Sequence, residues 1–470
     1  MTCSWRVDRT WCRPGDGTWV AGGVPRRLWR LGAGGRRVAD ALERGEPPPP
    51  GHEPLTRRLV EAGALHPEPV AAAPLMRCDV VVPTLNGSPD ALHRLVTQVQ
   101  AELGSSASVV IVDDASDLPV QACDAVRVIR TAERGGPAQA RNVGTAPGDA
   151  EVLLFVDDDI DLPPGWAAPL LGHLDDPTVV AVAPRIIGPA PDDARRWWQR
   201  SEQVRSPLDL GPQPAPVRAG GRVPYVPSAV LLVRRRAFEQ AKGFDTDLRY
   251  GEDVDLVWRL YRAGGQVRYD PRVVVHHEAR PTWRGWLTQR FAYGTSAAPL
   301  AVRHPDAIVA ARLNTSQLVV WLAVLIGHPL AALAALATAG RSTLALRRVL
   351  TERGIADAGR WALRWSAAGL VASARQCASA LWRPWWPLAL LGALVSRRGR
   401  RVAVAATVVT IADDLVWWRR APRLDPLRFV ATARVGDLAY GAGVWRGAWQ
   451  HRTWKPLRLS RGTPSKVGQP

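Results

Sequence analysis

The sequence has little cysteine, methionine or lysine, and the few cysteines argue against two kinds of structural site. Among 470 residues there are 2 methionines and 5 cysteines, and the cysteines form no CxxC pair and no cluster with histidine. This pattern predicts neither a disulfide framework nor a zinc site, and it favours a reducing compartment. The first residues also lack the basic-then-apolar pattern of a signal peptide, so we expect the catalytic part to face the cytoplasm.

Acidic residues are scarce in the last third of the chain. The whole sequence has 61 basic and 43 acidic residues, and arginine supplies all but three of the basic ones. The two signs balance over residues 1–300, so the formal net charge of +18 arises within 301–470. Such a surface could bind nucleic acid or an anionic membrane. Nucleic-acid binding predicts basic and aromatic residues on the folded core, which is neutral, so we expect no nucleic-acid partner and favour the membrane.

A hydrophobic content of 47% with 22% charged residues excludes a disordered chain, and proline-rich breaks at 47–50 and 67–74 set apart a first region, 1–73. Strands are expected there at 18–24 and 27–31, and helices at 33–43 and 55–62. This winged-helix-like order, with the phrase LWRL at 28–31, resembles the PqqD-like domains that present leader peptides to modifying enzymes. An extension with only a structural role is the alternative.

Residues 77–299 alternate between apolar strands and amphipathic helices. Strands are expected at 79–82, 109–112, 125–129 and 151–156, and helices at 89–103 and 137–143. This alternation predicts a doubly wound, mainly parallel α/β sheet. Ligands bind such sheets beyond the carboxyl ends of the strands, so the residues after each strand are candidates for a site.

Acidic residues follow two of these strands. Asp113 and Asp114 end one strand, and Asp157, Asp158 and Asp159 follow another. Like charges this close repel one another, and a bound divalent cation would neutralise them. Mg²⁺ or Mn²⁺ shared with substrate phosphates fits this pattern, whereas an exposed acidic turn would explain an isolated triplet. Because two strands both end in consecutive aspartates, we predict a nucleotide-diphosphate site.

A third acidic group opens a predicted helix after Gly251. Glu252 and Asp253 occupy its first turn, where a carboxylate either stabilises the helix N-terminus or acts as a general base towards a hydroxyl in the cleft. Spacing alone leaves both roles open. Asp255 is expected to support the helix.

These segments occur in an order that resembles a known family. They are VVVPTLN at 80–86, VIVDDAS at 110–116, ARNVG at 140–144, LFVDDD at 154–159, GFD at 243–245, GEDVDL at 251–256 and PRVVVHH at 271–277. Together they resemble the inverting family-two glycosyltransferases, which have the GT-A fold. Each motif alone is weak, and the ordered series is specific.

The resemblance implies a nucleotide-sugar site. Pro83 and Thr84 would line the nucleoside pocket, and Asp114 would contact the base or ribose. Asp157 and Asp158 would lie towards the ribose or the sugar.

The resemblance also implies a metal ion and a catalytic base. Asp159, at the end of an Asp-x-Asp motif, would hold Mg²⁺ or Mn²⁺ on the donor diphosphate. His277 would bind the metal or diphosphate, with its neighbour His276 as the alternative. Asp253 would take the proton from the acceptor hydroxyl, and inversion would give a β-glycoside from an α-linked donor.

The last region, 300–470, is expected to be helical and membrane-associated. No Asp, Glu, Lys or Arg occurs within 313–340, so this segment is a candidate transmembrane helix. A buried or re-entrant helix pair, broken at His328-Pro329, is the alternative. The apolar stretches 387–395 and 402–411 are too short to span alone, and they lie near arginines and tryptophans, as in membrane-surface helices. These are Arg397, Arg398, Arg400, Arg401, Arg419 and Arg420, with Trp361, Trp365, Trp382, Trp385, Trp386, Trp417 and Trp418.

The three regions together suggest an acceptor. A PqqD-like segment, a family-two domain and a basic tail resemble the glycosyltransferases of the mycofactocin system, which attach β-linked glucose to a redox cofactor made from a ribosomal peptide. The resemblance implies UDP-glucose as donor, a peptide-derived acceptor, and a place at the cell membrane. A cell-envelope enzyme acting on a polyprenyl or glycolipid acceptor is the alternative, and a basic nucleic-acid-binding protein is a remote one.

Overall fold

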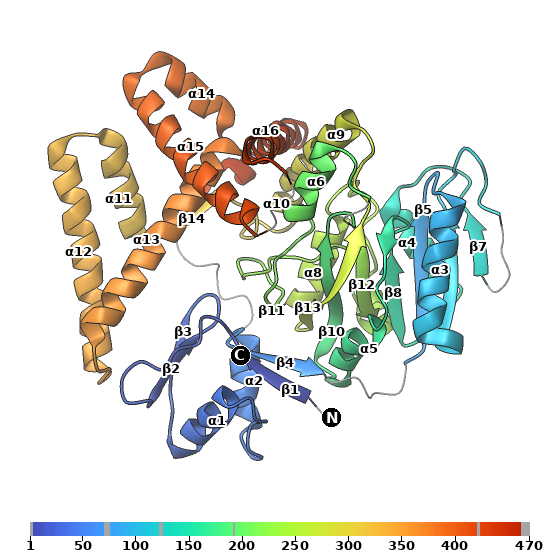
Figure 1. The fold of residues 1–470 in the computed structure, drawn as a ribbon, viewed down its shortest axis with the longest axis horizontal. Helices are drawn as coiled ribbons and strands as arrows, with labels where there is room; N and C mark the ends of the chain where they lie inside the picture. The colour runs from blue at the N-terminus through green and yellow to red at the C-terminus, as the bar shows by residue number, and fades with distance from the viewer. Residues whose placement is uncertain (1–2, 70–75, 122–125, 191–192, 421–423, 462–470) are drawn as a thin grey trace.

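A mixed sheet of nine strands forms the core of residues 78–277, to the right of the C-terminal helices in Figure 1. The computed structural model describes residues 3–69, 76–121, 126–190, 193–420 and 424–461. The strands of this sheet are β5 (Cys78–Thr84), β6 (Ala107–Asp113), β7 (Val126–Arg130), β8 (Val152–Val156), β9 (Ile160–Asp161), β10 (Val179–Ile187), β11 (Ala215–Pro216), β12 (Val230–Arg234) and β13 (Gln266–His277). Their order across the sheet is β11-β13-β10-β12-β8-β5-β6-β7, and β9 pairs with β13.

The half of the sheet that contains the early strands is parallel, as the alternating pattern predicts. β8, β5, β6 and β7 are neighbours and run in one direction. All four predicted strands form, as do the helices α3 (Pro89–Leu103) and α4 (Pro137–Thr145), although residue 125 lies outside the described part. The other half is mixed, because β12 runs antiparallel between β8 and β10. No helical pattern precedes β12 directly, so a parallel crossover is absent there.

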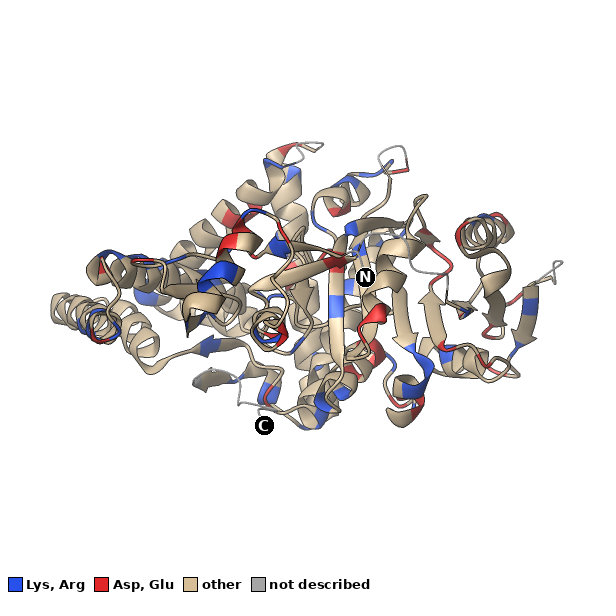
Figure 2. Ribbon diagram, turned by 90° about the horizontal axis from the view of Figure 1, so that it is seen from below, with Lys and Arg blue, Asp and Glu red and all other residues tan. Residues whose placement is uncertain are grey.

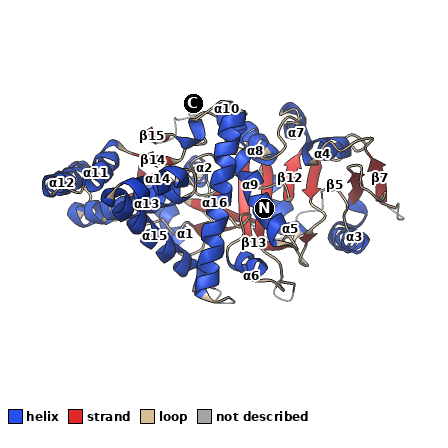
Figure 3. Cartoon of the chain, turned by 90° about the horizontal axis from the view of Figure 1, so that it is seen from above, coloured by secondary structure: helices blue, strands red, loops and turns tan. Residues whose placement is uncertain are grey.

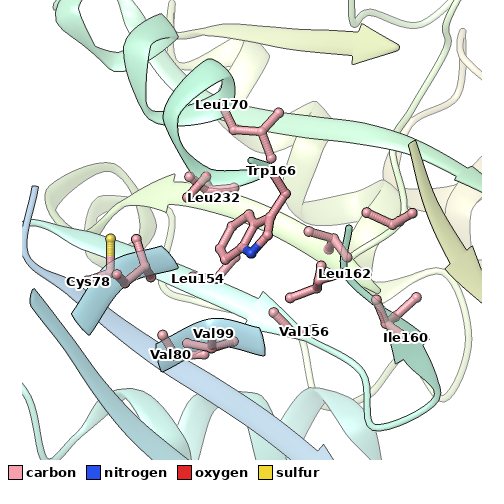
Figure 4. Close-up of a cluster of buried hydrophobic side chains, with 14 of the residues drawn as sticks. Cys78, Val80, Val99, Leu154, Val156, Ile160, Leu162, Trp166, Leu170 and Leu232 are labelled. Carbon is pink, nitrogen blue, oxygen red and sulfur yellow. The ribbon is translucent and has the colours of Figure 1, made fainter. Parts of the chain in front are cut away.

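Apolar side chains of the central strands alternate between two cores. Leu154 packs with α3 and α5 (Ala167–Leu171) on one face, where Trp166 is also buried (Figure 4). Leu153 packs on the other face with α4, α7 (Arg235–Gln240) and α8 (Glu252–Arg262). Strands buried on both faces are mostly apolar, as β8 is throughout and β5 is except for the buried Asp79 and Thr84. The sheet is therefore rigid where its carboxyl ends form the site.

The N-terminal region contains the elements expected from its sequence. β2 (Trp19–Gly22) pairs with β3 (Arg27–Arg30), and α1 (Ala33–Glu43) and α2 (Glu53–Glu61) follow. A further pair, β1 (Cys3–Val7) with β4 (Leu65–Pro69), completes the region. The sequence did not predict this pair, because prolines such as those of β4 argue against a strand. The likeness to a winged-helix domain stays a prediction.

Buried polar contacts fix this region to its neighbours. Arg222 of the catalytic domain binds both carboxylate oxygens of the buried Asp8, at 2.5 and 2.8 Å, and His66 Nε2 lies 3.1 Å from Asp8. On another side, the Trp19 indole donates to the carbonyl of Arg353 at 3.1 Å. The region therefore bridges the catalytic domain and the C-terminal helices.

Helices make up most of the remaining chain. They are α6 (Trp197–Val204) within the catalytic domain, then α9 (Trp283–Thr295), α10 (Ala297–Arg303), α11 (Thr315–Ile326), α12 (Pro329–Glu352), α13 (Ala358–Trp382), α14 (Trp386–Val395), α15 (Arg397–Trp418) and α16 (Pro426–Gln450), with the short strand β14 (Ala311–Leu313) before α11. α10 runs across residue 300, where the predicted boundary lies. α16 lies along α9 and α10, so the last helix packs on the catalytic domain (Figure 3).

The predicted transmembrane segment is split in two. α11 ends before Gly327, which has a φ of 64°, and Pro329 begins α12, so 313–340 forms an antiparallel helix pair. The break into a helix pair agrees with the second predicted alternative, but the pair is largely exposed rather than buried, and its re-entry into a membrane stays a prediction. α12 alone is long and apolar enough to cross a membrane, and 6% of its most apolar window is buried. Length and composition therefore make it the one candidate span in the described chain.

Several of the tryptophans expected at a membrane surface instead contact protein. Trp361 and Trp365 pack with Trp19 near the N-terminal region, and Trp385 donates to the carbonyl of Leu457 at 2.8 Å. A buried indole N–H needs a hydrogen-bond acceptor, which the protein supplies here. These contacts account for three of the tryptophans within the protein, and their place at the membrane level stays a prediction.

Candidate active site

One cavity of about 1790 Å³ lies beyond the carboxyl ends of β5, β6 and β8. Its position is the one expected for ligands of an α/β sheet. It is lined by all eight residues that the sequence analysis selected, which are Pro83, Thr84, Asp114, Asp157, Asp158, Asp159, Asp253 and His277. Residues far apart in sequence thus meet in a single site.

The loops after β5 and β6 form one side of the cavity. Asp114 accepts hydrogen bonds from the amides of Gly135 and Gly136, at 2.9 and 2.8 Å, which positions the start of α4. Thr84 donates its hydroxyl proton to Asp158. Asp114 therefore shapes this loop and also lines the cavity, where its Oδ2 accepts one hydrogen bond from the described residues and keeps a lone pair for a ligand.

The three aspartates after β8 have different surroundings. Asp157 accepts a hydrogen bond of 2.6 Å from the buried Arg141. Burial, partly opposed by the hydrogen bond from Thr84, raises the pKa of Asp158 to about 6, and the two neighbouring aspartates contribute. Asp159 Oδ1 is buried, with no hydrogen-bond partner among the described residues. Only Asp159 thus offers an unused, buried carboxylate oxygen.

The histidine pair separates into two environments. His277 Nε2 lies 3.3 Å from Asp159 Oδ2, whereas His276 Nδ1 lies 3.0 Å from the carbonyl oxygen of Gly188. Successive residues of a strand point to opposite faces, and only His277 lines the cavity. Burial would lower the pKa of His277, but the adjacent Asp159 raises it.

The first turn of α8 presents Asp253 to the cavity. Gly251, just before the helix, has a φ of 82°, and an added Cβ would lie 2.9 Å from Leu300. Asp253 Oδ1 accepts from its neighbouring amide at 2.7 Å, and Oδ2 from Ser228 at 3.4 Å. Burial raises the pKa of Asp253, which makes it a stronger base than an exposed aspartate.

Asp255 has the supporting role expected of it. Its carboxylate binds Arg259 Nε at 2.6 Å and lies 2.7 Å from His304 Nε2. It is buried and lies outside the cavity lining.

Arg141 joins the two acidic motifs, a role that the sequence analysis missed. Its guanidinium donates to Asp157 at 2.6 Å and to Glu252 at 2.9 Å. Burial and the adjacent Asp253 nevertheless raise the pKa of Glu252 to about 7. The segment ARNVG was noticed as a motif, but the partner Glu252 is 111 residues away, so sequence spacing gave no sign of the contact.

The described residues contain no cluster of three histidine, cysteine or acidic side chains suited to hold a metal ion. Asp159 and His277 supply two groups, 3.3 Å apart. Mg²⁺ in nucleotide sites takes one or two protein carboxylates and completes its shell with substrate phosphates and water. The unpartnered Asp159 oxygen fits that arrangement, with the donor diphosphate providing the other ligands.

The opposite wall comes from the C-terminal helices. The lining there includes Arg383 after α13, Trp417 of α15, and three residues of α16, namely Phe429, Asp437 and Tyr440. The sequence analysis assigned this region to a membrane surface and named no site residue in it. Apolar helices carry no local signal of which face meets a distant cleft, which explains the omission.

The chain is similar to known glycosyltransferases. The model of Glycosyl transferase family 2 matches residues 79–241. A pre-mycofactocin glycosyltransferase of Mycobacterium tuberculosis is 39% identical over 483 residues, covering 96% of each chain. Mouse polypeptide N-acetylgalactosaminyltransferase 6 is 27% identical over 37% of this chain and 32% of its own.

A solved mannosyltransferase from Pyrobaculum calidifontis, in complex with GDP-Man and Mn²⁺, is 18% identical and covers 81% of this chain and 89% of its own. Its TM-score is 0.44, too low to support an inference about this chain.

Proposed function

Because the chain belongs to glycosyltransferase family 2, and within it to the mycofactocin-system enzymes, we propose that it transfers glucose from UDP-glucose to a peptide-derived mycofactocin precursor. The new bond is β, formed with inversion. The observation that carries this proposal is that the acidic triplet 157–159 and Asp253 line one cavity. The acceptor is supported by the near full-length similarity to the mycobacterial enzyme.

Asp253 is the general base in this proposal. It takes the proton of the acceptor hydroxyl while that oxygen attacks the anomeric carbon from the face opposite the diphosphate. The bond from the anomeric carbon to the diphosphate oxygen breaks, and the nucleoside diphosphate leaves with the electron pair. Its raised pKa suits Asp253 to accept a proton near neutral pH, and the base contributes about 10² to 10⁴ in rate.

Cationic groups lie beside the expected diphosphate position. Arg280 lines the cavity and interacts electrostatically with Asp158 and Asp159. Arg141 holds Asp157 and Glu252 in place, so the donor and base motifs keep a fixed separation. Preorganised positive charge stabilises a leaving diphosphate without reorganisation during the reaction.

We assign a divalent cation, Mg²⁺ or Mn²⁺, to Asp159 and His277. Bound there with the donor, it would act as a Lewis acid on the diphosphate. Asp158, with a raised pKa, contacts the donor ribose or sugar in this arrangement and accepts a hydrogen bond from Thr84.

We also propose that the C-terminal region binds an anionic membrane surface on the cytoplasmic side. Two helical hairpins, 315–352 and 386–418, leave many aliphatic side chains exposed, which is unfavourable in water. They include Leu322, Leu325, Ile326, Leu330, Leu333, Leu336, Leu388, Leu391, Leu394, Val395, Val404 and Val408.

Charge at the second hairpin supports an anionic partner. α15 begins with the exposed Arg397, Arg398 and Arg400, and no acidic residue occurs in its first turn. The positive end of the helix dipole repels these arginines, so anionic headgroups would relieve an unfavourable arrangement. Basic and acidic residues are both present across the catalytic domain (Figure 2).

A polyprenyl or glycolipid acceptor is the second candidate, because a lipid-bound enzyme with exposed apolar helices could take its acceptor from the bilayer. The two candidates share donor, base and metal ion. They differ only in the acceptor that accelerates nucleotide release.

A nucleotide-release assay tests the proposed function. The protein is incubated with UDP-glucose or GDP-mannose and Mg²⁺ or Mn²⁺, with pre-mycofactocin, polyprenyl phosphate or neither, and with EDTA as the metal-free control. We expect UDP release that requires a divalent cation and increases with pre-mycofactocin, whose product gains one hexose with a β-anomeric proton coupling. Absence of transfer from every donor contradicts the enzyme proposal, and transfer to polyprenyl phosphate alone favours the second candidate.

A further inference from the structure

The cavity is larger than one ligand requires. Pockets for single small molecules usually measure about 300–1,000 Å³, whereas this cavity measures about 1790 Å³. The strand ends and the acidic triplet occupy one side, which the nucleotide sugar accounts for. The other side is formed by α9, α16 and Arg383, and the donor leaves it unused.

Tyrosines gather on this unused side around the base. The chain has 6 tyrosines, and four line the cavity. Tyr250 does so just before α8, and Tyr225, Tyr293 and Tyr440 do so from a loop, from α9 and from α16. Burial raises the pKa of Tyr225 to about 12, and Tyr440 and Asp253, which line the same cavity, contribute to the rise. Burial also raises the pKa of Tyr293, and the charge of Asp253 contributes to the rise.

The hydroxyls of Tyr225, Tyr293 and Tyr440 are unused within the protein. None of them has a hydrogen-bond partner among the described residues, although each is half-buried. By contrast, the buried Tyr269 donates its hydroxyl proton to the carbonyl of Gly211 at 2.7 Å. No hydrogen bond within the described part of the protein occupies these three hydroxyls, and none of them is a fully buried atom, so they are available to a polar ligand in the cavity.

Tyr440 is held in place by its surroundings. The guanidinium of Arg383 lies over its ring, 4.2 Å from the centroid, and Arg383 Nε is 3.2 Å from Asp437 Oδ1. Backbone contacts fix the helix itself, because a Cβ at Gly443 would collide with the carbonyl of Phe291 in α9. The ring and hydroxyl of Tyr440 are thus preorganised relative to the catalytic domain.

We propose that Tyr440, with Tyr293 and Tyr225, forms the acceptor subsite, and that its ligand is a ring-bearing, hydroxyl-rich acceptor whose reacting oxygen lies at Asp253. The aromatic faces pack against the acceptor ring, and the tyrosine hydroxyls bind its polar groups. Tyr440 is then a specificity-determining residue contributed by the C-terminal helices, outside residues 79–241 that match the family model. This inference rests on the proposed function and adds where and how the acceptor binds.

The conservative variant Tyr440→Phe tests the subsite by steady-state kinetics with UDP-glucose and pre-mycofactocin. Losing one hydrogen bond should raise the acceptor KM about five- to tenfold, while the donor KM changes less than about twofold. Tyr440→Ala should raise the acceptor KM further, because the ring surface is lost too. Tyr261→Phe is the matched control, since Tyr261 is also half-buried but lies outside the cavity lining.

The outcomes separate this inference from the proposed function. If wild-type protein transfers glucose but Tyr440→Phe and Tyr440→Ala keep the wild-type acceptor KM, the subsite is overturned and the proposed function stands. If both KM values rise equally in Tyr440→Phe, the residue acts through general packing, which also overturns the subsite. If wild-type protein uses no sugar nucleotide, both proposals fail.

Discussion

The catalytic domain and the two C-terminal hairpins both contain many aliphatic side chains but bury them differently. In the central strand β8, Leu154 and Val156 are fully buried between two helical layers. In the hairpins, Leu336 and Leu394 are 71% and 79% exposed. The protein thus buries the apolar residues of its sheet within its own fold, whereas those of its hairpins would be buried only by another apolar environment.

α16 belongs to the C-terminal region by sequence and to the catalytic domain by packing. Its Phe429 and Ala448 are fully buried, and it lines the cavity that contains Asp253. The basic third of the chain therefore combines two surfaces, hairpins that face outward and a helix that completes the site. The net charge and composition of this region are sums over both surfaces, so they do not distinguish one from the other.

Replacing the base should have the largest effect and shows whether the chemistry lies in the catalytic domain alone. Asp253→Asn keeps the size of the side chain and one of its two accepting oxygens, and it removes the proton acceptor. We expect glucose transfer to fall by about 10² to 10⁴, with donor affinity changed by less than about threefold, measured by nucleotide release and by calorimetry.

Asp255→Asn is the matched control on the same helix. It weakens the contacts with Arg259 and His304, so it should lower the free energy of unfolding by about 1–3 kcal/mol and leave kcat of the folded enzyme nearly unchanged. Transfer by Asp253→Asn within tenfold of wild type would contradict the base assignment.

The donor half of the site could be predicted because its signals are local. Each acidic group directly follows an apolar strand, and parallel strands place their carboxyl ends at one edge of the sheet. All eight predicted residues accordingly line one cavity. His277 could be told from His276 only in the structure, because strand register decides which side chain faces inward.

The acceptor half could not be predicted, because its contacts join distant segments. Arg383 and Tyr440 line the cavity with Tyr293 only after α16 packs on α9. The break of 313–340 into two helices was left open, although Gly327 and Pro329 are a local signal for it. Pro67 and Pro69 likewise hid the strand β4.

Charging the exposed hairpin residues should have the next largest effect. Leu336→Asp and Leu394→Asp each remove a side chain proposed to enter the lipid interface. We expect the affinity for phosphatidylglycerol-containing vesicles, measured by co-sedimentation, to fall at least about tenfold for each, since burying a leucine contributes about 1.5–3 kcal/mol.

Leu118→Asp provides the matched control, because Leu118 is 84% exposed in the catalytic domain. It should leave vesicle binding unchanged. Equal vesicle binding by all three variants would contradict the proposal that the hairpins, and not the catalytic domain, bind lipid. Vesicle binding of wild-type protein that does not change with salt concentration would also contradict it.

Two glycine substitutions should give the smallest effects and test the packing of α16 against the outward helices. At Gly443 an added Cβ collides with the carbonyl of Phe291, and both groups belong to helix backbones that cannot rotate away. At Gly392 of α14 no described atom lies within 4 Å of an added Cβ. Gly443→Ala should therefore lower the free energy of unfolding by about 1–3 kcal/mol, measured by urea denaturation.

Gly392→Ala should instead raise the free energy of unfolding by about 0.5–1 kcal/mol, because alanine favours the helix and meets nothing there. If α16 positions Tyr440, Gly443→Ala should also raise the acceptor KM more than the donor KM, while Gly392→Ala changes neither. Equal free energies of unfolding for the two variants would mean that α16 does not pack closely against α9. The C-terminal helices would then all face outward, and the acceptor would have to bind to the catalytic domain alone.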